Sequence, residues 1–142
     1  MSNTGLKAFD DTIHRTNTWL HEITSRMGWD DRSRGYRLLR ASLHAIRDRM
    51  DVAGAANLSA QLPLLIRGIF FEGWQPMKAR GSGDLDSFLA RIAEAFPDDP
   101  DFDARAAFCE VLSVMRMHLS EGEYAKLRRA MPDGLHCFWE EA

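Results

Sequence analysis

Two stretches of this chain repeat the same pattern of apolar residues, 69 residues apart and without a gap. The first contains Leu39, Leu43, Ile46, Met50, Leu58, Leu62, Pro63, Ile66, Ile69 and Phe70. The second contains Phe108, Leu112, Met115, Leu119, Leu127, Met131, Pro132, Leu135, Phe138 and Trp139. Spacings of three and four residues are typical of amphipathic helices. The chain is therefore predicted to be a duplicated helical unit.

The fold predicted from this pattern is all-α, because no segment of the sequence sustains the alternation of a half-buried strand. A chain of 142 residues fits one domain with its own core. We expect seven or eight helices in a single domain, 1–142, with two tandem helical repeats over about 31–74 and 100–141. The predicted segments are an N-terminal helix at about 5–27, a first unit at about 29–74, a linker at 75–83, a bridging helix at about 84–96 and a second unit at about 98–142.

Capping residues support several of these helix boundaries. Gly28 is suited to end the N-terminal helix, because glycine adopts the left-handed conformation at little cost. Asp51 and Ser120 stand at matching positions of the two units, and each is suited to accept a hydrogen bond from an exposed amide in the first turn of a helix. Pro63 and Pro132 then restart the chain at matching points.

The N-terminal helix carries a near-heptad apolar stripe, interrupted by one polar step at Thr16. Its members are Leu6, Phe9, Ile13, Leu20, Ile23 and Met27. Such a stripe either packs on the repeats or joins two copies of the chain.

Composition excludes several classes of protein. The chain is 45% hydrophobic and 27% charged, as in globular proteins, and the N-terminus lacks the pattern of a signal peptide. Apolar runs are too short to span a membrane, so we expect a cytoplasmic protein without membrane contact. Neither half is strongly basic, which argues against a nucleic-acid partner. Cys109 and Cys137 have no C-x-x-C spacing and are expected to be reduced thiols that fill packing space.

One segment resembles a known family. The residues from Ala41 to Met50, followed by those from Ala60 to Trp74, are similar to the bacterial family catalogued as domain of unknown function 2267. The resemblance covers about residues 29–96 closely, and the rest through the second unit that ends in Phe138 and Trp139. It implies a bacterial helical domain and no catalytic residues.

Comparing the two units indicates where binding residues are to be sought. Asp48, Arg49, Gln61 and Arg67 match Met117, His118, Ala130 and His136, whereas Arg47 and Arg116 are alike. Arginine and tryptophan are favoured at interaction sites. The candidate binding residues are Arg47, Asp48, Arg49, Gln61, Arg67 and Trp74. The alternative is that Arg47 and Asp48 are solvated and that Arg67 makes structural hydrogen bonds.

A second helix is predicted at about residues 31–50, and a basic stripe runs along it at Arg37, Arg40, His44 and Arg47. It suggests a regulatory module that binds a small anionic ligand or nucleic acid through Arg37, Arg40, Arg47 and Arg67. The competing interpretation is a solvated helix face that docks against the acidic residues between 98 and 103.

Catalytic and metal-binding patterns are weak. Asp11, His14 and His21 lie on one side of the first helix, but Glu-x-x-His and His-Glu-x-x-His are absent from the sequence. His118, Glu121, His136 and Cys137 would need the fold to bring them together. Glycine-rich phosphate loops and Gly-x-Ser-x-Gly elbows are also absent. We therefore assign no catalytic residue, metal ligand or cofactor, and a metal-dependent enzyme is the third-ranked hypothesis.

The leading hypothesis is a non-enzymatic module that binds a protein partner or a second copy of itself. The N-terminal helix and the Arg and Trp face of the first unit are the two surfaces on which this hypothesis depends.

Overall fold

The computed structural model describes residues 3–78, 80–81 and 83–141. Positions 79 and 82 of the predicted linker, and position 142 at the end of the predicted second unit, lie outside the described residues. The described part contains eight α-helices, one 3-10 helix and no strand, which confirms the all-α prediction. The elements are α1 (Lys7–Met27), α2 (Arg32–Arg47), α3 (Val52–Ala60), α4 (Leu64–Phe71), α5 (Leu85–Ala93), α6 (Ala104–His118), α7 (Glu121–Ala130), η1 (Asp133–Leu135) and α8 (Phe138–Glu141).

The predicted caps are present at their helix ends. Gly28 follows α1 with a φ of 70°, in the left-handed region. The Asp51 Oδ1 accepts a hydrogen bond from the Gly54 amide at 2.7 Å, and the Ser120 Oγ accepts one from the Glu123 amide at 3.1 Å. Each bond satisfies an amide that has no partner within its own helix. These side chains therefore fix where α3 and α7 begin.

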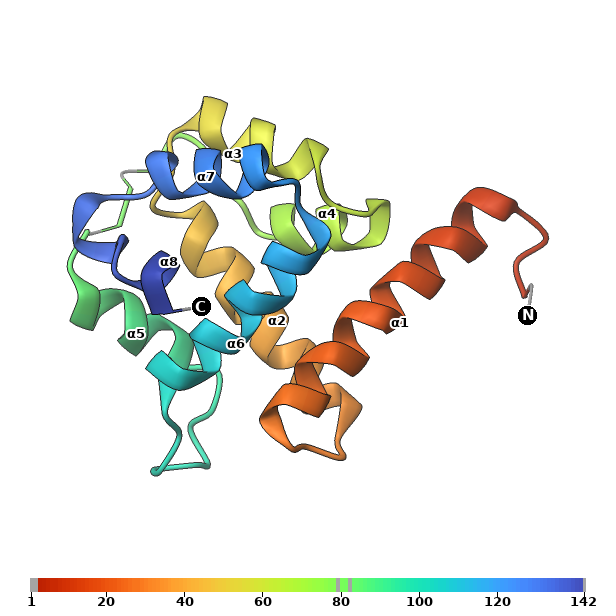
Figure 1. Cartoon of the computed structure of the whole chain (residues 1–142), viewed down its shortest axis with the longest axis horizontal. Coiled ribbons are helices and arrows are strands. Elements are labelled where there is room, and N and C mark those ends of the chain that lie inside the picture. Colours follow the sequence, from red (N-terminus) through yellow and green to blue (C-terminus); the bar gives the residue numbers. More distant parts are fainter. Residues whose placement is uncertain (1–2, 79, 82, 142) are drawn as a thin grey trace.

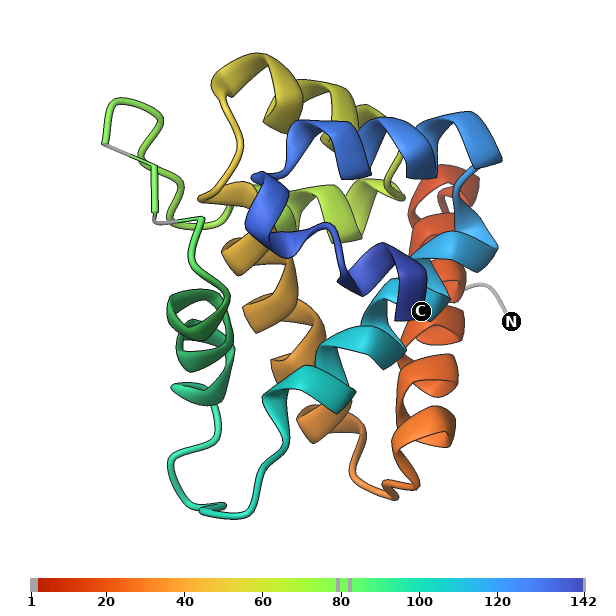
Figure 2. The ribbon, with the colours of Figure 1, turned by 60° about the vertical axis from the view of Figure 1, so that its left-hand side comes forward.

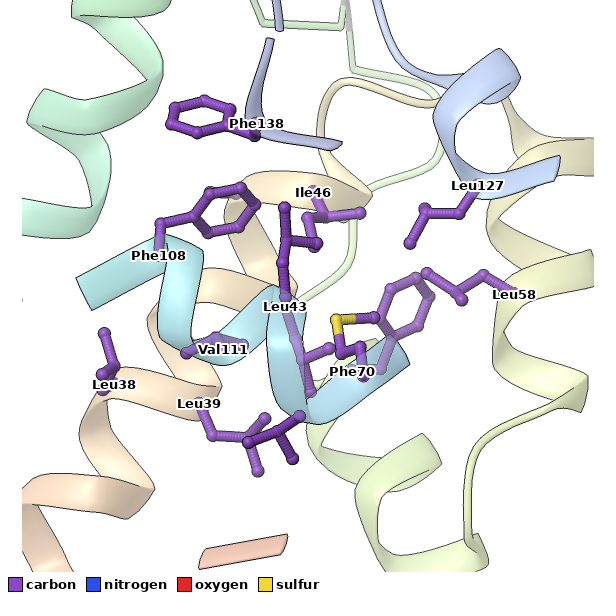
Figure 3. Close-up of a cluster of buried hydrophobic side chains, with 14 of the residues drawn as sticks. Leu38, Leu39, Leu43, Ile46, Leu58, Phe70, Phe108, Val111, Leu127 and Phe138 are labelled. Atoms are coloured by element: carbon purple, nitrogen blue, oxygen red, sulfur yellow. The ribbon is translucent and has the colours of Figure 1, made fainter. Parts of the chain in front are cut away.

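The two longest central helices, α2 and α6, pack against each other and organise the rest of the chain (Figure 1). Helices α3 and α7 lie side by side over one end of this pair, while α5 packs on both α2 and α6. Leu43 of α2, Phe70 of α4 and Phe108 of α6 are fully buried between these elements. Figure 3 shows Leu58 from α3 and Leu127 from α7 in the same apolar cluster. Both units thus contribute to one core.

Helix α1 has two halves with different environments. From Thr16 to Thr24 its inner face is buried against α2 and α6, with Trp19 and Ile23 almost fully covered. From Lys7 to Arg15 the helix extends beyond the body of the molecule (Figure 1). The predicted apolar stripe therefore continues into a segment that the chain itself does not cover.

One pair of helices keeps the spacing of the predicted repeat. Helix α3 begins at Val52 and α7 at Glu121, again 69 residues apart. Pro63 and Pro132 each precede a further helical segment, which is continuous in α4 and divided into η1 and α8 in the second unit. The duplication itself stays a prediction, which a superposition of the two units would test.

None of the described helices combines the length and the hydropathy that a membrane-spanning helix requires.

Candidate functional site

Arg47 lies at the last position of α2 and is buried, with 4% of its surface exposed. One Nη donates hydrogen bonds to the backbone carbonyls of Phe70 and Glu72, at 2.9 and 2.8 Å. Its Nε and other Nη donate to the Asp48 carboxylate at 2.9 and 3.2 Å. The guanidinium therefore ties the end of α4 to the end of α2.

Asp48 is held between two arginines from different helices. Besides Arg47, it pairs with Arg91 of α5, whose Nη2 lies 2.7 Å from its Oδ2. Burial alone would raise the pKa of the Asp48 carboxyl, but the hydrogen bonds from Arg47 and Arg91 outweigh burial and lower the pKa below its ordinary value. Asp48 is consequently an anion that helps to join α2 and α5.

Arg49 holds the segment between α4 and α5 in place. The residue is 6% exposed, and its guanidinium lies 5.4 Å from the ring centre of Phe88. Gly81 packs directly on this guanidinium, since a Cβ at that position would approach the Arg49 Cζ to 2.9 Å. The Gly81 amide also donates to the Asp48 carbonyl at 2.8 Å. Gly81 thus holds the described part of this segment against the end of α2, and we call this contact the strap.

A pocket of about 550 Å³ lies beside the strap. Arg47, Asp48 and Trp74 line it, so the structure brings three of the six candidate residues to one cavity. Trp74 is half-buried and packs its ring 5.0 Å from that of Phe71. We call this cavity the α2-end pocket.

Gln61 and Arg67 lie away from the α2-end pocket. Arg67 donates from Nε to the Ser59 carbonyl at 2.9 Å and from Nη2 to the Leu62 carbonyl at 3.2 Å. These bonds reach carbonyls in the last turn of α3 and just after it, and the Ser59 carbonyl also accepts from the Leu62 amide at 3.1 Å. Gln61 is exposed and follows the last residue of α3. The geometry thus gives Arg67 the structural role that the sequence analysis left open.

The basic stripe of α2 is largely engaged in contacts within the fold. Arg40 donates from Nε to the Glu72 carboxylate at 2.7 Å, and Arg37 donates to the Ala95 carbonyl at 3.5 Å. His44 is buried, with its Nε2 2.7 Å from the Ile69 carbonyl, and burial lowers the pKa of the His44 imidazole. Of the four residues of the predicted stripe, His44 and Arg47 are buried. Arg37 and Arg40 are exposed, and both make contacts within the fold.

A second surface lies between α1 and α4. Of the nine large hydrophobic residues that are exposed in the described part, five gather on this face: Phe9, Ile13, Tyr36, Leu64 and Leu65. They line two adjoining hollows of about 500 and 610 Å³, which share Ile13, Tyr36, Leu65 and Ile69. The Thr12 Oγ1 accepts from the Leu65 amide at 2.8 Å and so joins the two helices. We call this surface the α1–α4 groove.

The family model for uncharacterized conserved proteins, DUF2267, matches residues 16–138. That span is most of the chain. The chain belongs to the DUF2267 family. No curated protein shows significant sequence similarity to it.

The family match begins at Thr16, which is also the first buried residue of α1. The α1–α4 groove therefore has one wall inside the DUF2267 match, on α4, and part of its other wall before it. The α2-end pocket lies entirely within the match.

His118, His136 and Cys109 of this DUF2267 protein make contacts within the fold. His118 stacks on Trp19 at 4.9 Å and lies 2.6 Å from the Glu22 carboxylate, while the His136 Nε2 is 2.8 Å from the Met131 carbonyl. Burial and the neighbouring Glu141 raise the pKa of the Cys109 thiol to about 12, so it stays protonated at neutral pH. Among the described residues, no three His, Cys, Asp or Glu side chains are placed to hold a metal ion.

Sequence reasoning missed several residues of both surfaces. Lys78, Arg80 and Arg91 line the α2-end pocket, but they come from a loop and a separate helix, so no periodic pattern links them. Leu64 and Leu65 of the α1–α4 groove belong to a continuous apolar run, where periodicity does not separate buried from exposed positions. The length of that run could have indicated exposed apolar residues, because one face of a short helix cannot bury all of them.

Proposed function

We propose that this DUF2267 protein is a non-enzymatic self-association module, whose α1–α4 groove receives the same surface of a second copy. One observation supports this most strongly: five of the nine exposed large apolar side chains of the described residues line this groove. Scattered exposed apolar residues are normal, but a contiguous group marks an interaction surface. The proposal also takes the protein to be bacterial and cytoplasmic, as the sequence predicts.

The shape of the surface favours a helix as its occupant. Leu6, Phe9 and Ile13 follow the spacing i, i+3 and i+7, which is the anchor pattern of helices that dock in apolar grooves. These residues are 55%, 48% and 41% exposed. The chain thus carries both a groove and, in α1, a helix of the kind that fits one.

This combination favours a second copy over an unrelated partner. In a twofold symmetric dimer the same patch lies on both sides of the interface, so a surface with both a ridge and a groove is self-complementary. The charges near the groove have both signs, in the pairs Lys7 with Asp11 and Arg40 with Glu72. A balanced rim of this kind does not repel a second copy of itself.

Sedimentation velocity over a series of concentrations tests the proposal. The wild type is expected to sediment as a dimer, and Leu65→Glu or Phe9→Glu as a monomer, because a carboxylate would be buried without a partner. Both side chains are exposed in the single copy, so folding should be preserved, which circular dichroism checks.

The matched control is Met77→Glu, which makes a similar change at a side chain that is 95% exposed and lies outside the groove. It should dimerise like the wild type. A wild type that stays monomeric at every concentration would overturn the proposal. So would a dimer that persists in both groove variants.

A further inference from the structure

We propose that the α2-end pocket binds a small organic polyanion, whose phosphate or carboxylate groups contact Lys78, Arg80 and Arg91. This inference is independent of self-association, because no residue lines both the α2-end pocket and the α1–α4 groove. It also uses different cations from the α2 stripe that the sequence suggested.

The pocket is assembled from segments that are distant in sequence. The end of α2, the start of α3, the segment after α4 and Arg91 of α5 all contribute to its lining. The segment between α4 and α5 runs outside the end of α2, as Figure 2 shows. The fold therefore gathers charges that no local sequence pattern predicts.

The balance of charge in the pocket is positive. Its lining includes four cations, Arg47, Lys78, Arg80 and Arg91, but two carboxylates, Asp48 and Asp51. Asp48 is already shared by Arg47 and Arg91. In a chain of net charge −3, this local excess of positive charge runs against the overall sign.

Two of these cations are available to a ligand. In the part of the chain that the structure describes, no hydrogen bond or ion pair engages the side chain of Lys78 or Arg80, and both residues are exposed. Arg91, by contrast, makes its 2.7 Å contact to Asp48 through Nη2. Hydrogen bonds to charged groups are the stronger ones in proteins, so an anion that reaches these cations would gain affinity from each of them.

The size and the remaining lining point to an organic ligand. A volume of about 550 Å³ lies within the range of pockets for small molecules. Half-buried Trp74 adds a flat apolar wall that suits the carbon skeleton or ring of such a ligand. A polyanion with a planar or apolar portion matches both parts of the lining.

The strap at Gly81 positions the cationic wall. Gly81 lies against the Arg49 guanidinium and bonds to the Asp48 carbonyl, directly after Arg80 in the chain. Gly81→Ala would place the added Cβ 2.9 Å from the Arg49 Cζ, so the Arg49 guanidinium or the backbone beside Arg80 must shift. It should weaken ligand binding although it removes no charge.

Isothermal titration calorimetry at low ionic strength tests the proposal with pyrophosphate, citrate and AMP as probes and inorganic phosphate as the reference. The wild type should bind all three, and AMP should bind more tightly than inorganic phosphate. The double variant Lys78→Glu/Arg80→Glu should weaken binding by at least about tenfold. Trp74→Ala should remove the advantage of AMP over phosphate.

The control is Arg129→Glu, a charge reversal at an exposed residue of α7 that does not line the pocket. It should leave each affinity within about twofold, because distant exposed charges are screened by salt. Equal weakening in the control, or no binding of any probe, would overturn the proposal. Tight binding of a single-stranded oligonucleotide without binding of the small anions would also overturn it, in favour of a nucleic-acid surface.

Discussion

Arg67 in the first unit and His136 in the second stand 69 residues apart and do the same structural work with different chemistry. The Arg67 Nη2 donates to the Leu62 carbonyl at 3.2 Å, and the His136 Nε2 lies 2.8 Å from the Met131 carbonyl. Leu62 and Met131 are themselves 69 residues apart. A difference in residue type between the units therefore does not by itself mark a functional site.

Arg47 and Arg116 show that identical residues at matching positions can have different roles. They are identical residues at matching positions, yet Arg47 is buried against two carbonyls of the first unit. Arg116 is exposed and lies 5.5 Å from the ring centre of Tyr124. Shared identity is therefore an equally poor guide to shared role.

The two units differ most in the segments that precede their matching helices. Trp19 and Ile23 of α1 are buried as Phe88 and Ile92 of α5 are, again 69 residues apart. Before them, residues 7–15 form an exposed helical extension, whereas the described residues of 76–84 form no helix. These two segments carry part of the α1–α4 groove and part of the α2-end pocket. Both proposed sites therefore include residues from segments in which the two predicted units differ in secondary structure.

The largest difference between the units should appear when the two matching arginines are replaced. Arg47→Met leaves two backbone carbonyls and part of the Asp48 carboxylate without donors, so the free energy of unfolding should fall by about 3 to 5 kcal/mol. Arg116→Met removes an exposed guanidinium that lies 5.5 Å from the Tyr124 ring centre, and it should cost about 1 kcal/mol or less. Urea denaturation measures both values, and equal losses would contradict the assigned roles.

A smaller and more nearly equal pair of effects is expected at Arg67 and His136. Arg67→Ala removes a charged donor from two carbonyls and should cost about 1.5 to 3 kcal/mol. His136→Ala removes one such bond and should cost about 1 kcal/mol. The same denaturation experiment applies. If Arg67→Ala left stability unchanged but abolished binding of pyrophosphate, Arg67 would be a ligand residue rather than a structural one.

The smallest effect is the pH dependence of the free energy of unfolding. It is expected from His44 in the first unit, whereas the matching residue of the second unit is Ser113. Burial lowers the pKa of His44 in the folded protein, so below the unfolded value of about 6.5 the unfolded chain binds more protons. The free energy of unfolding should therefore fall as pH decreases from 6.5 towards the folded pKa. His44→Gln keeps a donor for the Ile69 carbonyl and should flatten this dependence. An unchanged pH profile in the variant would show that another group is responsible.

The fold could be predicted from local patterns because its determinants are local. Helical periodicity and the caps at Gly28, Asp51 and Ser120 gave the order of the helices and most of their ends. The second helix was predicted to reach residue 50 but ends at Arg47, since the next residues form turns around the buried Arg47 and Arg49. The bridging helix was likewise predicted as 84–96 and spans Leu85–Ala93.

The candidate sites were harder to predict, because they depend on how distant segments meet. Periodicity identifies the apolar face of α1 but does not reveal that residues 7–15 extend past the body that would cover it. Lys78, Arg80 and Arg91 reach one pocket only through the path of the segment after α4. Arg47, Asp48 and Trp74 were among the candidates selected from the sequence and line that pocket, but they were grouped with Gln61 and Arg67, which lie elsewhere.

The central claim is that a second copy of the chain occupies the α1–α4 groove. Mixing isotope-labelled and unlabelled protein, and recording only the nuclear Overhauser effects between the two, tests it most directly. If the dimer forms through the α1–α4 groove, contacts between copies are expected at the methyl groups of Ile13, Leu64, Leu65 and Ile69. The absence of any contact between copies, or contacts confined to Met77 or Val52 outside the groove, would contradict it.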